Sequence, residues 1–201
     1  MQQELNNYNQ YFKHLNKLSY TGLIYQRLFK APLLYYHLRC FGQRVIEIGS
    51  GIGNGVLGSY PSYVVGIDVN PLAVSYCQSK GFNVKLIKEN EKYPFGNSIF
   101  NCCLLDNVLE HIQNSKFTLD ECYRITDNNG GLVVVVPGIM GYNHDSDHKI
   151  YYDEKKLRDL DPRWELISLI SLPFIFKSIK LSKLLRQYCL MAIYKKISFK
   201  D

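Results

Sequence analysis

The stretch Val45-Ile46-Glu47-Ile48-Gly49-Ser50-Gly51-Ile52-Gly53-Asn54-Gly55 decides the fold of this chain. Its first four residues, three apolar and one acidic, predict a short strand, and the alternate glycines after them predict a turn that opens a helix through Val56 and Leu57. Glycine removes the side chain where backbone must approach a ligand, and a loop entering a helix N-terminus offers free N–H groups. Glu47 places a carboxylate where the phosphates of a dinucleotide would be repelled.

Short β-branched or aromatic segments alternate with helical segments from residue 44 onward. The expected strands are Arg44–Ile48, Tyr63–Asp68, Asn83–Ile87, Ile99–Asp106, Leu132–Val136, Trp164–Leu172 and Gln187–Lys196. The expected helices are Asn54–Gly58, Pro71–Lys80, Ser115–Thr126, Asp153–Leu160 and Pro173–Arg186. Several strands are apolar throughout, as in parallel strands buried on both faces. The pattern predicts an α/β, doubly wound parallel sheet with its ligand at the carboxyl ends of the strands.

Individual residues predict where these segments begin and end. Asn70 and Pro71 are expected to be the N-cap and first residue of the Pro71–Lys80 helix. Gly81 is expected to end that helix, and the pair Gly130-Gly131 is expected to end the next one. Residues Gly138–Lys149 are expected to form a loop.

The chain has the size and composition of one domain. Its 201 residues, 46% of them hydrophobic, are enough for a full core, and no linker, repeat or low-complexity segment divides them. Residues 1–42 are expected to be an N-terminal helical cap of the same domain that residues 43–201 form, with Pro32 as a kink or break within Tyr20–Leu38. The cap tyrosines either cover a ligand or pack the helix on the sheet; these are Tyr8, Tyr11 and Tyr20.

The cysteines and the start of the chain indicate a cytoplasmic protein. The six cysteines form no CxxC pair and no zinc spacing, so we expect buried thiols in a reducing compartment. Cys102 and Cys103 are expected to lie in the core on opposite faces of one strand. The polar start Met1-Gln2-Gln3-Glu4 is unlike a secretory signal, and no apolar run approaches the ~20 residues of a membrane span.

The net charge of +6 is concentrated near the C-terminus. Residues 166–200 hold seven basic residues and no acid, whereas the residues before them are balanced. Because the body lacks a basic stripe, a nucleic-acid partner is not expected. The helix expected over Pro173–Arg186 is either a solvated cover of the acceptor site or a peripheral contact, through residues 173–200, with a membrane or a lipid-linked anionic substrate.

Five motifs carry a family resemblance over roughly residues 43–160. They are Glu47-x-Gly49-x-Gly51-x-Gly53, Gly66-Ile67-Asp68-Val69-Asn70-Pro71, Glu89-Asn90 followed by Tyr93-Pro94-Phe95, Val108-Leu109-Glu110-His111, and Gly130-Gly131-Leu132. In this order they resemble the class I S-adenosylmethionine (SAM) dependent methyltransferases, most of all the small-molecule and glycan methyltransferases with a VLEH motif. The resemblance implies a Rossmann-like seven-stranded sheet, mostly parallel with the last strand antiparallel and helices on both faces. It also implies SAM as cofactor and S-adenosylhomocysteine as product.

The resemblance also implies a set of cofactor-binding residues. Asp68, about 20 residues after the glycine loop, would accept hydrogen bonds from the ribose hydroxyls. Glu47 would attract the cationic end of SAM, and Asp106 would lie beside the sulfonium methyl group. The full set is Glu47, Gly49, Ser50, Gly51, Gly53, Asp68, Val69, Glu89, Asn90, Asp106 and Asn107, in which Glu89 or Asn90 would bind the adenine amino group.

Two other interpretations, a dinucleotide-binding protein and a methyltransferase of amino groups, fit the sequence less well. The pattern Gly53-x-Gly55-x-x-Gly58 matches a dinucleotide fingerprint by letter, but it begins five residues past the strand and its glycines fall in the helix. Methyltransferases of adenine or glutamine amino groups carry Pro-Pro-Tyr where this chain has Asp106-Asn107-Val108-Leu109.

The segment His144-Asp145-Ser146-Asp147-His148 follows the fifth strand and is the candidate catalytic loop. Three readings remain open: a general base, His144 or His148, oriented by a neighbouring acid such as Asp145; a divalent metal held by His and Asp; or a polar loop that orders a lid. The spacing is no specific metal signature, so no metal is assigned. His148 is slightly favoured because it precedes Tyr151-Tyr152, as a histidine often does in the family.

The predicted function is direct in-line methyl transfer from SAM to a hydroxyl of a sugar or glycan precursor. The alternatives are methyl transfer to another small molecule, such as a lipid head group or natural product, and a non-catalytic SAM-binding partner protein. The oligomeric state is not predicted.

Overall fold

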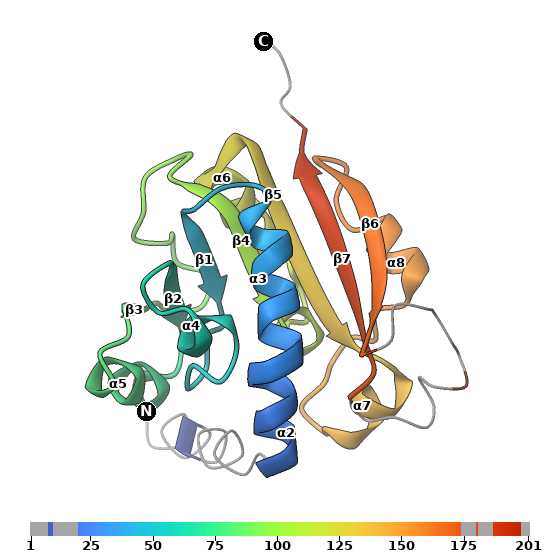
Figure 1. Cartoon of the computed structure of the whole chain (residues 1–201). Coiled ribbons are helices and arrows are strands. Elements are labelled where there is room, and N and C mark those ends of the chain that lie inside the picture. The colour runs from blue at the N-terminus through green and yellow to red at the C-terminus, as the bar shows by residue number, and fades with distance from the viewer. Residues whose placement is uncertain (1–7, 10–19, 174–179, 181–186, 198–201) are drawn as a thin grey trace.

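The computed structural model describes residues 8–9, 20–173, 180 and 187–197. These residues contain a seven-stranded sheet in the order β3-β2-β1-β4-β5-β7-β6 (Figure 1). The strands are β1 Val45–Ile48, β2 Val64–Asp68, β3 Val84–Leu86, β4 Phe100–Asp106, β5 Thr126–Pro137, β6 Trp164–Leu172 and β7 Cys189–Lys196. Strands β1 to β5 pair in parallel, and β7 is antiparallel to both of its neighbours. The predicted mixed sheet with an antiparallel last strand is confirmed.

Helices cover both faces of this sheet. They are α2 Tyr20–Tyr25, the π-helix η1 Gln26–Lys30, α3 Ala31–Arg39, α4 Val56–Ser59, α5 Pro71–Ser79, the 3-10 helix η2 Leu109–His111, α6 Lys116–Ile125, α7 Ile139–His144 and α8 Glu154–Arg158. Helices α3, α4 and α5 share one apolar cluster with the sheet, and α6 and α8 share the other. Figure 1 shows α3 in front of the strands and α6 behind them.

Alternate residues of each central strand enter opposite clusters because side chains in a strand alternate between its two faces. Cys102 and Leu104 of β4 pack under α3, whereas Cys103 and Leu105 pack under α6, and all four are fully buried. The predicted placement of Cys102 and Cys103 on opposite faces is confirmed. Cys40 at the end of α3 is exposed, so the prediction of buried thiols is wrong for this residue.

The start of α5 forms as its sequence predicts. The Asn70 side chain accepts hydrogen bonds from the backbone N–H groups of Leu72 and Ala73, at 3.0 and 3.4 Å, and Pro71 is the first helical residue. Gly81, with φ of +79°, follows the end of the helix. The carboxyl end of β2, which ends at Asp68, therefore lies beside the start of α5.

The N-terminal helix does not break at Pro32. The chain stays helical from α2 through η1 into α3, and the π-helix η1 lies just before the proline. Proline is tolerated there because it stands within the first turn of α3, and a π-helical turn offsets the helix register. This continuous segment carries Lys30 to the end of the sheet where the carboxyl ends of the strands lie.

Two other expected boundaries are wrong. Gly130 and Gly131 do not end a helix; they lie inside β5, where a Cβ on Gly131 would come within 2.5 Å of the Phe41 ring. Helix α6 ends instead at Ile125. The next residue, Thr126, is extended, and its hydroxyl donates to the Cys122 carbonyl at 2.6 Å. Residues 138–149, expected as loop, contain the short helix α7.

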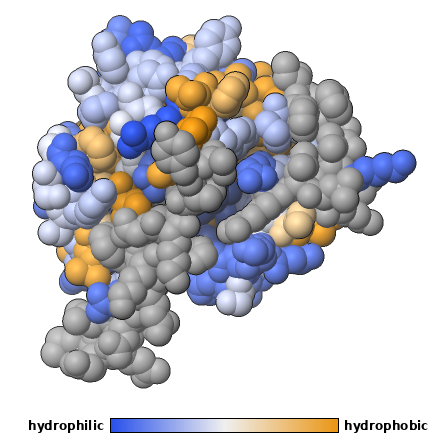
Figure 2. Space-filling model, turned by 60° about the horizontal axis from the view of Figure 1, so that its bottom comes forward, coloured by the Kyte–Doolittle hydropathy of each residue, from blue (hydrophilic) through white to orange (hydrophobic). Residues whose placement is uncertain are grey.

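The carboxyl ends of β1 and β5 point to the bottom of Figure 1. Figure 2 turns this end forward and shows hydrophobic and hydrophilic residues intermixed on its surface. Most of the expected Pro173–Arg186 helix, and much of the 1–42 cap, lie outside the described residues. Among the helices that the structure describes, none combines the length and apolar character needed to cross a membrane.

Candidate cofactor and acceptor site

The glycine loop turns sharply between β1 and α4. Gly49 and Gly51 have φ of +69° and +53°, which L side chains rarely adopt, and a Cβ on Gly49 would lie 2.7 Å from a methyl group of Val108. The N–H groups of Gly49 and Ser50 both donate to the Ile67 carbonyl, at 2.8 and 3.1 Å. The loop is therefore held against the end of β2.

Asp68 joins the glycine loop to the start of α5. One carboxylate oxygen accepts the Gly51 N–H at 2.7 Å and the other accepts the Asn70 N–H at 2.8 Å. Burial raises the pKa of Asp68, while these backbone hydrogen bonds lower it. Each carboxylate oxygen has more than one acceptor direction, so both oxygens can also accept from a ligand hydroxyl.

Glu47 lies at the carboxyl end of β1 and is only 3% exposed. One of its oxygens accepts the Leu57 N–H at 2.7 Å, at the start of α4. A Cβ on Gly55 would lie 2.7 Å from the other oxygen of Glu47 and 3.8 Å from Asp106, so glycine leaves space beside both acids. Burial first, and then the charge of Asp106, raise the pKa of Glu47 to about 8.

Asp106 at the carboxyl end of β4 forms a buried ion pair. Its Oδ1 atom lies 2.6 Å from Lys30 Nζ, and the two side chains are 7% and 1% exposed. Asn107, with φ of +54°, donates from its side-chain amide to the same oxygen at 3.2 Å. Asp106 therefore lies beside Glu47 with a lysine as its counter-ion.

The other expected cofactor residues differ in their burial. The Ser50 hydroxyl is buried and forms no hydrogen bond within the described structure. Val69 is half-buried after β2, whereas Glu89 and Asn90 are exposed on the turn after β3. Gly53 lies in the loop with φ of +73°.

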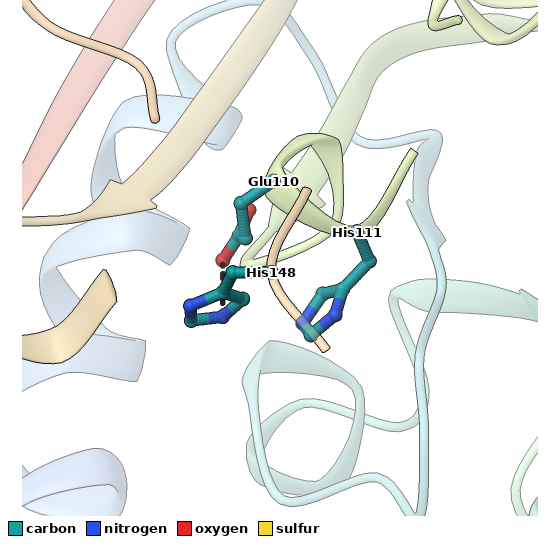
Figure 3. A group of neighbouring side chains, drawn as sticks. All are labelled: Glu110, His111 and His148. Atoms are coloured by element: carbon teal, nitrogen blue, oxygen red, sulfur yellow. Dashed lines mark ion pairs between the residues drawn. The ribbon is translucent and has the colours of Figure 1, made fainter. Parts of the chain in front are cut away.

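A second cluster lies beyond Asp106 and consists of Glu110, His111 and His148 (Figure 3). The first two residues belong to η2, directly after β4, and His148 follows α7. The N–H groups of Lys149 and Ile150 donate to the Glu110 carbonyl, at 2.7 and 3.2 Å, and these bonds hold the loop against η2. His148 Nε2 then lies 3.9 Å from Glu110 Oε1.

The ring of His148 is oriented by Tyr142. Its Nδ1 atom lies 2.8 Å from the Tyr142 carbonyl oxygen, and the two rings stack with centroids 5.2 Å apart. Because a carbonyl only accepts hydrogen bonds, neutral His148 carries its proton on Nδ1 and directs the Nε2 lone pair toward Glu110. Burial raises the pKa of Glu110 to about 8.

The other candidates in this loop lie outside the cluster. His144 is exposed at the end of α7, on a shallow hollow of about 440 Å³ lined also by Ile139, Met140 and Asn143. Asp145 accepts the Asp147 N–H at 3.0 Å, and Asp147 lies 3.4 Å from His111. The partner of His148 Nδ1 is thus a backbone carbonyl and not an aspartate.

The first site fits SAM in its chemistry. It offers a bare glycine backbone, an unpartnered buried hydroxyl on Ser50, and the carboxylates of Glu47, Asp68 and Asp106. Such acceptors match a ligand with ribose hydroxyls and positive charge, whereas a pyrophosphate would meet like charge.

Comparison with known proteins agrees with this chemistry. Residues 46–134 match the family described as a methyltransferase domain. Over 131 residues the chain is 26% identical to a probable S-adenosylmethionine-dependent methyltransferase of Mycobacterium tuberculosis. The aligned region covers 64% of this chain and 45% of that protein. The chain spans about half the length of the curated relatives it matches.

Two crystal structures share the fold. A SAM-dependent methyltransferase from Aquifex aeolicus aligns over 94% of this chain and 98% of its own, with a TM-score of 0.66 and 17% identity. The second is a geranyl diphosphate C-methyltransferase from Streptomyces coelicolor, in complex with Mg²⁺, geranyl diphosphate and S-adenosyl-L-homocysteine. It aligns over 84% of this chain and 77% of its own, with a TM-score of 0.65 and 12% identity. The chain is thus similar over residues 46–134 to the methyltransferase-domain family, and its fold is the one found in these SAM-dependent methyltransferases.

Sequence reasoning missed Lys30, Tyr142 and the role of Glu110. Lys30 is one of two basic residues in η1, with Arg27, and its partner is 76 residues away, so no local pattern indicates the pair. Glu110 belongs to the VLEH motif, but the motif does not indicate that its side chain is buried beside His148. Tyr142 acts through its carbonyl, which no sequence pattern identifies.

Proposed function

We propose that this protein transfers the methyl group of SAM to a hydroxyl oxygen of a sugar or glycan precursor. SAM supplies a methyl group on a sulfonium that leaves as a neutral thioether. The observation that carries the proposal is the buried pair Glu110–His148, 3.9 Å apart and beyond Asp106 at the carboxyl end of β4. A hydroxyl acceptor needs help to lose its proton, and a positioned histidine contributes ~10²–10⁴-fold to such reactions.

The glycine loop and its acids would hold SAM. Asp68 binds the ribose hydroxyls, and Glu47 attracts the cationic amino-acid end, which lies against the glycines at 49, 51 and 53. Asp106 and Asn107 lie beside the methyl group. Ser50, Val69, Glu89 and Asn90 complete the contacts, the last two with adenine.

The acceptor would lie between this site and the Glu110–His111–His148 cluster. His148 activates the acceptor hydroxyl, because its ring is oriented by Tyr142 and its Nε2 lone pair faces the interior. The other predicted catalytic residues are His144, which lines the hollow on α7, and Asp145, which directly follows that helix; both would contact the distal part of the acceptor.

A lipid-linked anionic acceptor or membrane surface would meet the basic segment 173–200. The support is its charge, since residues 166–200 contain seven basic residues and no acid. One of them is not available, because Lys196 is buried and donates to the Thr126 carbonyl at 2.6 Å. Flotation with anionic vesicles tests this contact, and absence of binding would leave the segment as a substrate cover.

The test of the proposed function combines SAM binding with turnover. Isothermal titration should show SAM binding to the wild type and to His148→Ala with equal affinity. A panel of sugar and nucleotide-sugar acceptors should yield methylated product with the wild type and about 10²–10⁴-fold slower with His148→Ala. Equal rates would remove His148 from the reaction, and SAM binding without turnover on any acceptor would favour a non-catalytic SAM-binding protein.

A further inference from the structure

We propose that Glu110, His111 and His148 form a binding site for a divalent transition-metal cation. The site itself follows from the geometry of these three side chains, and only its role in catalysis rests on the proposed function. Figure 3 shows the two η2 side chains and His148 directed toward a common space.

The separation of Glu110 and His148 suits two ligands of one cation. Each residue contributes one ligand atom, and all three atoms lie within 4.8 Å of one another. Two atoms bound to one metal at about 2.1 Å lie roughly 3–4 Å apart. The 3.9 Å between Glu110 Oε1 and His148 Nε2 falls in this range, whereas it is too long for a hydrogen bond.

The buried carboxylate of Glu110 needs a partner. Its side chain is 1% exposed, and neither oxygen accepts a hydrogen bond from the residues that the structure describes. A buried ionised carboxylate without a counter-charge is strongly unfavourable. The lone pair of His148 Nε2 faces the same oxygen, so two electron-pair donors face each other across a gap that a cation would fill.

The surrounding contacts resemble those that orient metal ligands. Metal-binding histidines commonly donate the second ring N–H to a carbonyl or carboxylate, which fixes the ring and its tautomer. His148 donates from Nδ1 to the Tyr142 carbonyl at 2.8 Å, and His111 lies 3.4 Å from the carboxylate of Asp147. Both histidines therefore have a partner outside the cluster.

The donor set favours a first-row transition ion such as Zn²⁺, Mn²⁺ or Fe²⁺. Two imidazoles and one carboxylate suit these ions, whereas Mg²⁺ and Ca²⁺ prefer oxygen ligands alone. Three protein ligands also leave coordination positions for a substrate oxygen.

Such a cation would activate the acceptor hydroxyl. Coordination lowers the pKa of the bound hydroxyl, whose proton passes to water. The O–CH₃ bond then forms as the S–CH₃ bond of SAM breaks, and the electron pair of that bond stays on sulfur. In this arrangement His148 acts as a metal ligand in place of a general base, because its single Nε2 lone pair cannot serve both roles.

Titration of the chelator-treated, full-length protein with Co²⁺ tests the site without any acceptor. We expect visible absorption bands that saturate at a single Co²⁺ per chain, and binding about a hundredfold weaker in Glu110→Gln and in His148→Ala. His144→Ala, a histidine four residues from His148 that lies outside the cluster, should bind Co²⁺ like the wild type.

The outcomes are separable. SAM titration and circular dichroism of each variant check that the protein is folded. No saturable Co²⁺ binding, or binding that Glu110→Gln and His148→Ala leave unchanged, overturns the metal site even when SAM binds. Loss of binding in His144→Ala alone would assign the metal to the loop instead and also overturn it. Failure of SAM to bind while Co²⁺ binding persists would overturn the proposed function and leave the metal site standing.

Discussion

Lys30 Nζ lies 2.6 Å from Asp106 Oδ1 in an almost fully buried ion pair that joins the N-terminal helix to the centre of the sheet. Burial lowers the pKa of Lys30, but the attraction of Asp106 outweighs it, so the pKa is raised and the lysine stays charged. The pair supplies one positive charge among the carboxylates of the cofactor site. It also ties residues 20–39 to the strand beside which the methyl group would lie.

Removing the lysine should destabilise the protein. Lys30→Met leaves Asp106 buried without its counter-ion, which typically costs about 3–5 kcal/mol of unfolding free energy. Urea denaturation measures this change. Lys88→Met is the matched control, because Lys88 and Glu91 form an exposed ion pair 3.1 Å apart whose loss should cost under ~1 kcal/mol. Equal stabilities for the two variants would show that the buried pair has no structural role.

Asp68→Ala should weaken SAM binding. The variant would lose the proposed charge-assisted hydrogen bonds to the ribose, each worth about 1.5–3 kcal/mol, or roughly ten- to hundredfold in affinity. Isothermal titration provides the measurement, and Asp127→Ala, which removes an exposed carboxylate paired with Arg44, provides the control. If the Asp68 variant bound SAM as tightly as the control, the ribose assignment would be rejected.

Glu47 should make the stability of the free protein depend on pH. Its pKa is raised by burial to about 8, so between about pH 4.5 and 8 the folded state keeps a proton that the unfolded state has released. Stability therefore falls as pH rises through this window, by up to ~1.4 kcal/mol per pH unit. Denaturation across this range should show a shallower slope for Glu47→Gln, and the difference between the two profiles isolates this residue.

Binding of SAM should change the pH dependence of stability in a defined direction. Because a cationic ligand favours the ionised carboxylate, saturating SAM should reduce the pH dependence of the wild type. If the unfolding free energies of Glu47→Gln and wild type changed in parallel with pH, the pKa of Glu47 would be the same in the folded and unfolded states. Another acid would then carry the negative charge of the site.

Gly58→Ala should be destabilising although it lies in a helix. Alanine normally stabilises a helix interior by ~1 kcal/mol over glycine. Here the added Cβ would overlap the Gly53 carbonyl oxygen of the glycine loop, and such overpacking costs about 1–3 kcal/mol. Thermal unfolding should show a lower melting temperature, while Gly96→Ala, whose Cβ would meet only the flexible end of Ile99, should change it little. A stabilised Gly58→Ala would contradict the close contact of loop and helix.

The strands and the glycine loop were predictable because local pattern determines them. The alternation of short apolar strands with helices gave the sheet, and Asn70 and Pro71 gave the start of α5. The role of the glycines at 130 and 131 was not predictable, because Gly131 leaves room for the Phe41 ring, a contact between residues 90 positions apart. Helix α7 was missed because its six residues bury no side chain and so show no apolar period.

The candidate site was predictable only in part. The order of the motifs predicts that Asp68, Glu47 and Asp106 lie at the carboxyl ends of three neighbouring strands. The structure has them at the carboxyl ends of β2, β1 and β4. The partners of these acids were not predictable, since Lys30 reaches Asp106 only because the helix continues through Pro32. Likewise, His148 meets Glu110 only because the loop after α7 docks on η2 through backbone hydrogen bonds.

The glycine loop and Asp68 are proposed to bind SAM. A crystal structure of the protein soaked with SAM is the decisive measurement. We predict density for the nucleoside against the glycines at 49 and 51, with both ribose hydroxyls within hydrogen-bond distance of the Asp68 carboxylate. An empty cleft at saturating SAM, or a pyrophosphate cofactor bound in its place, would contradict the account.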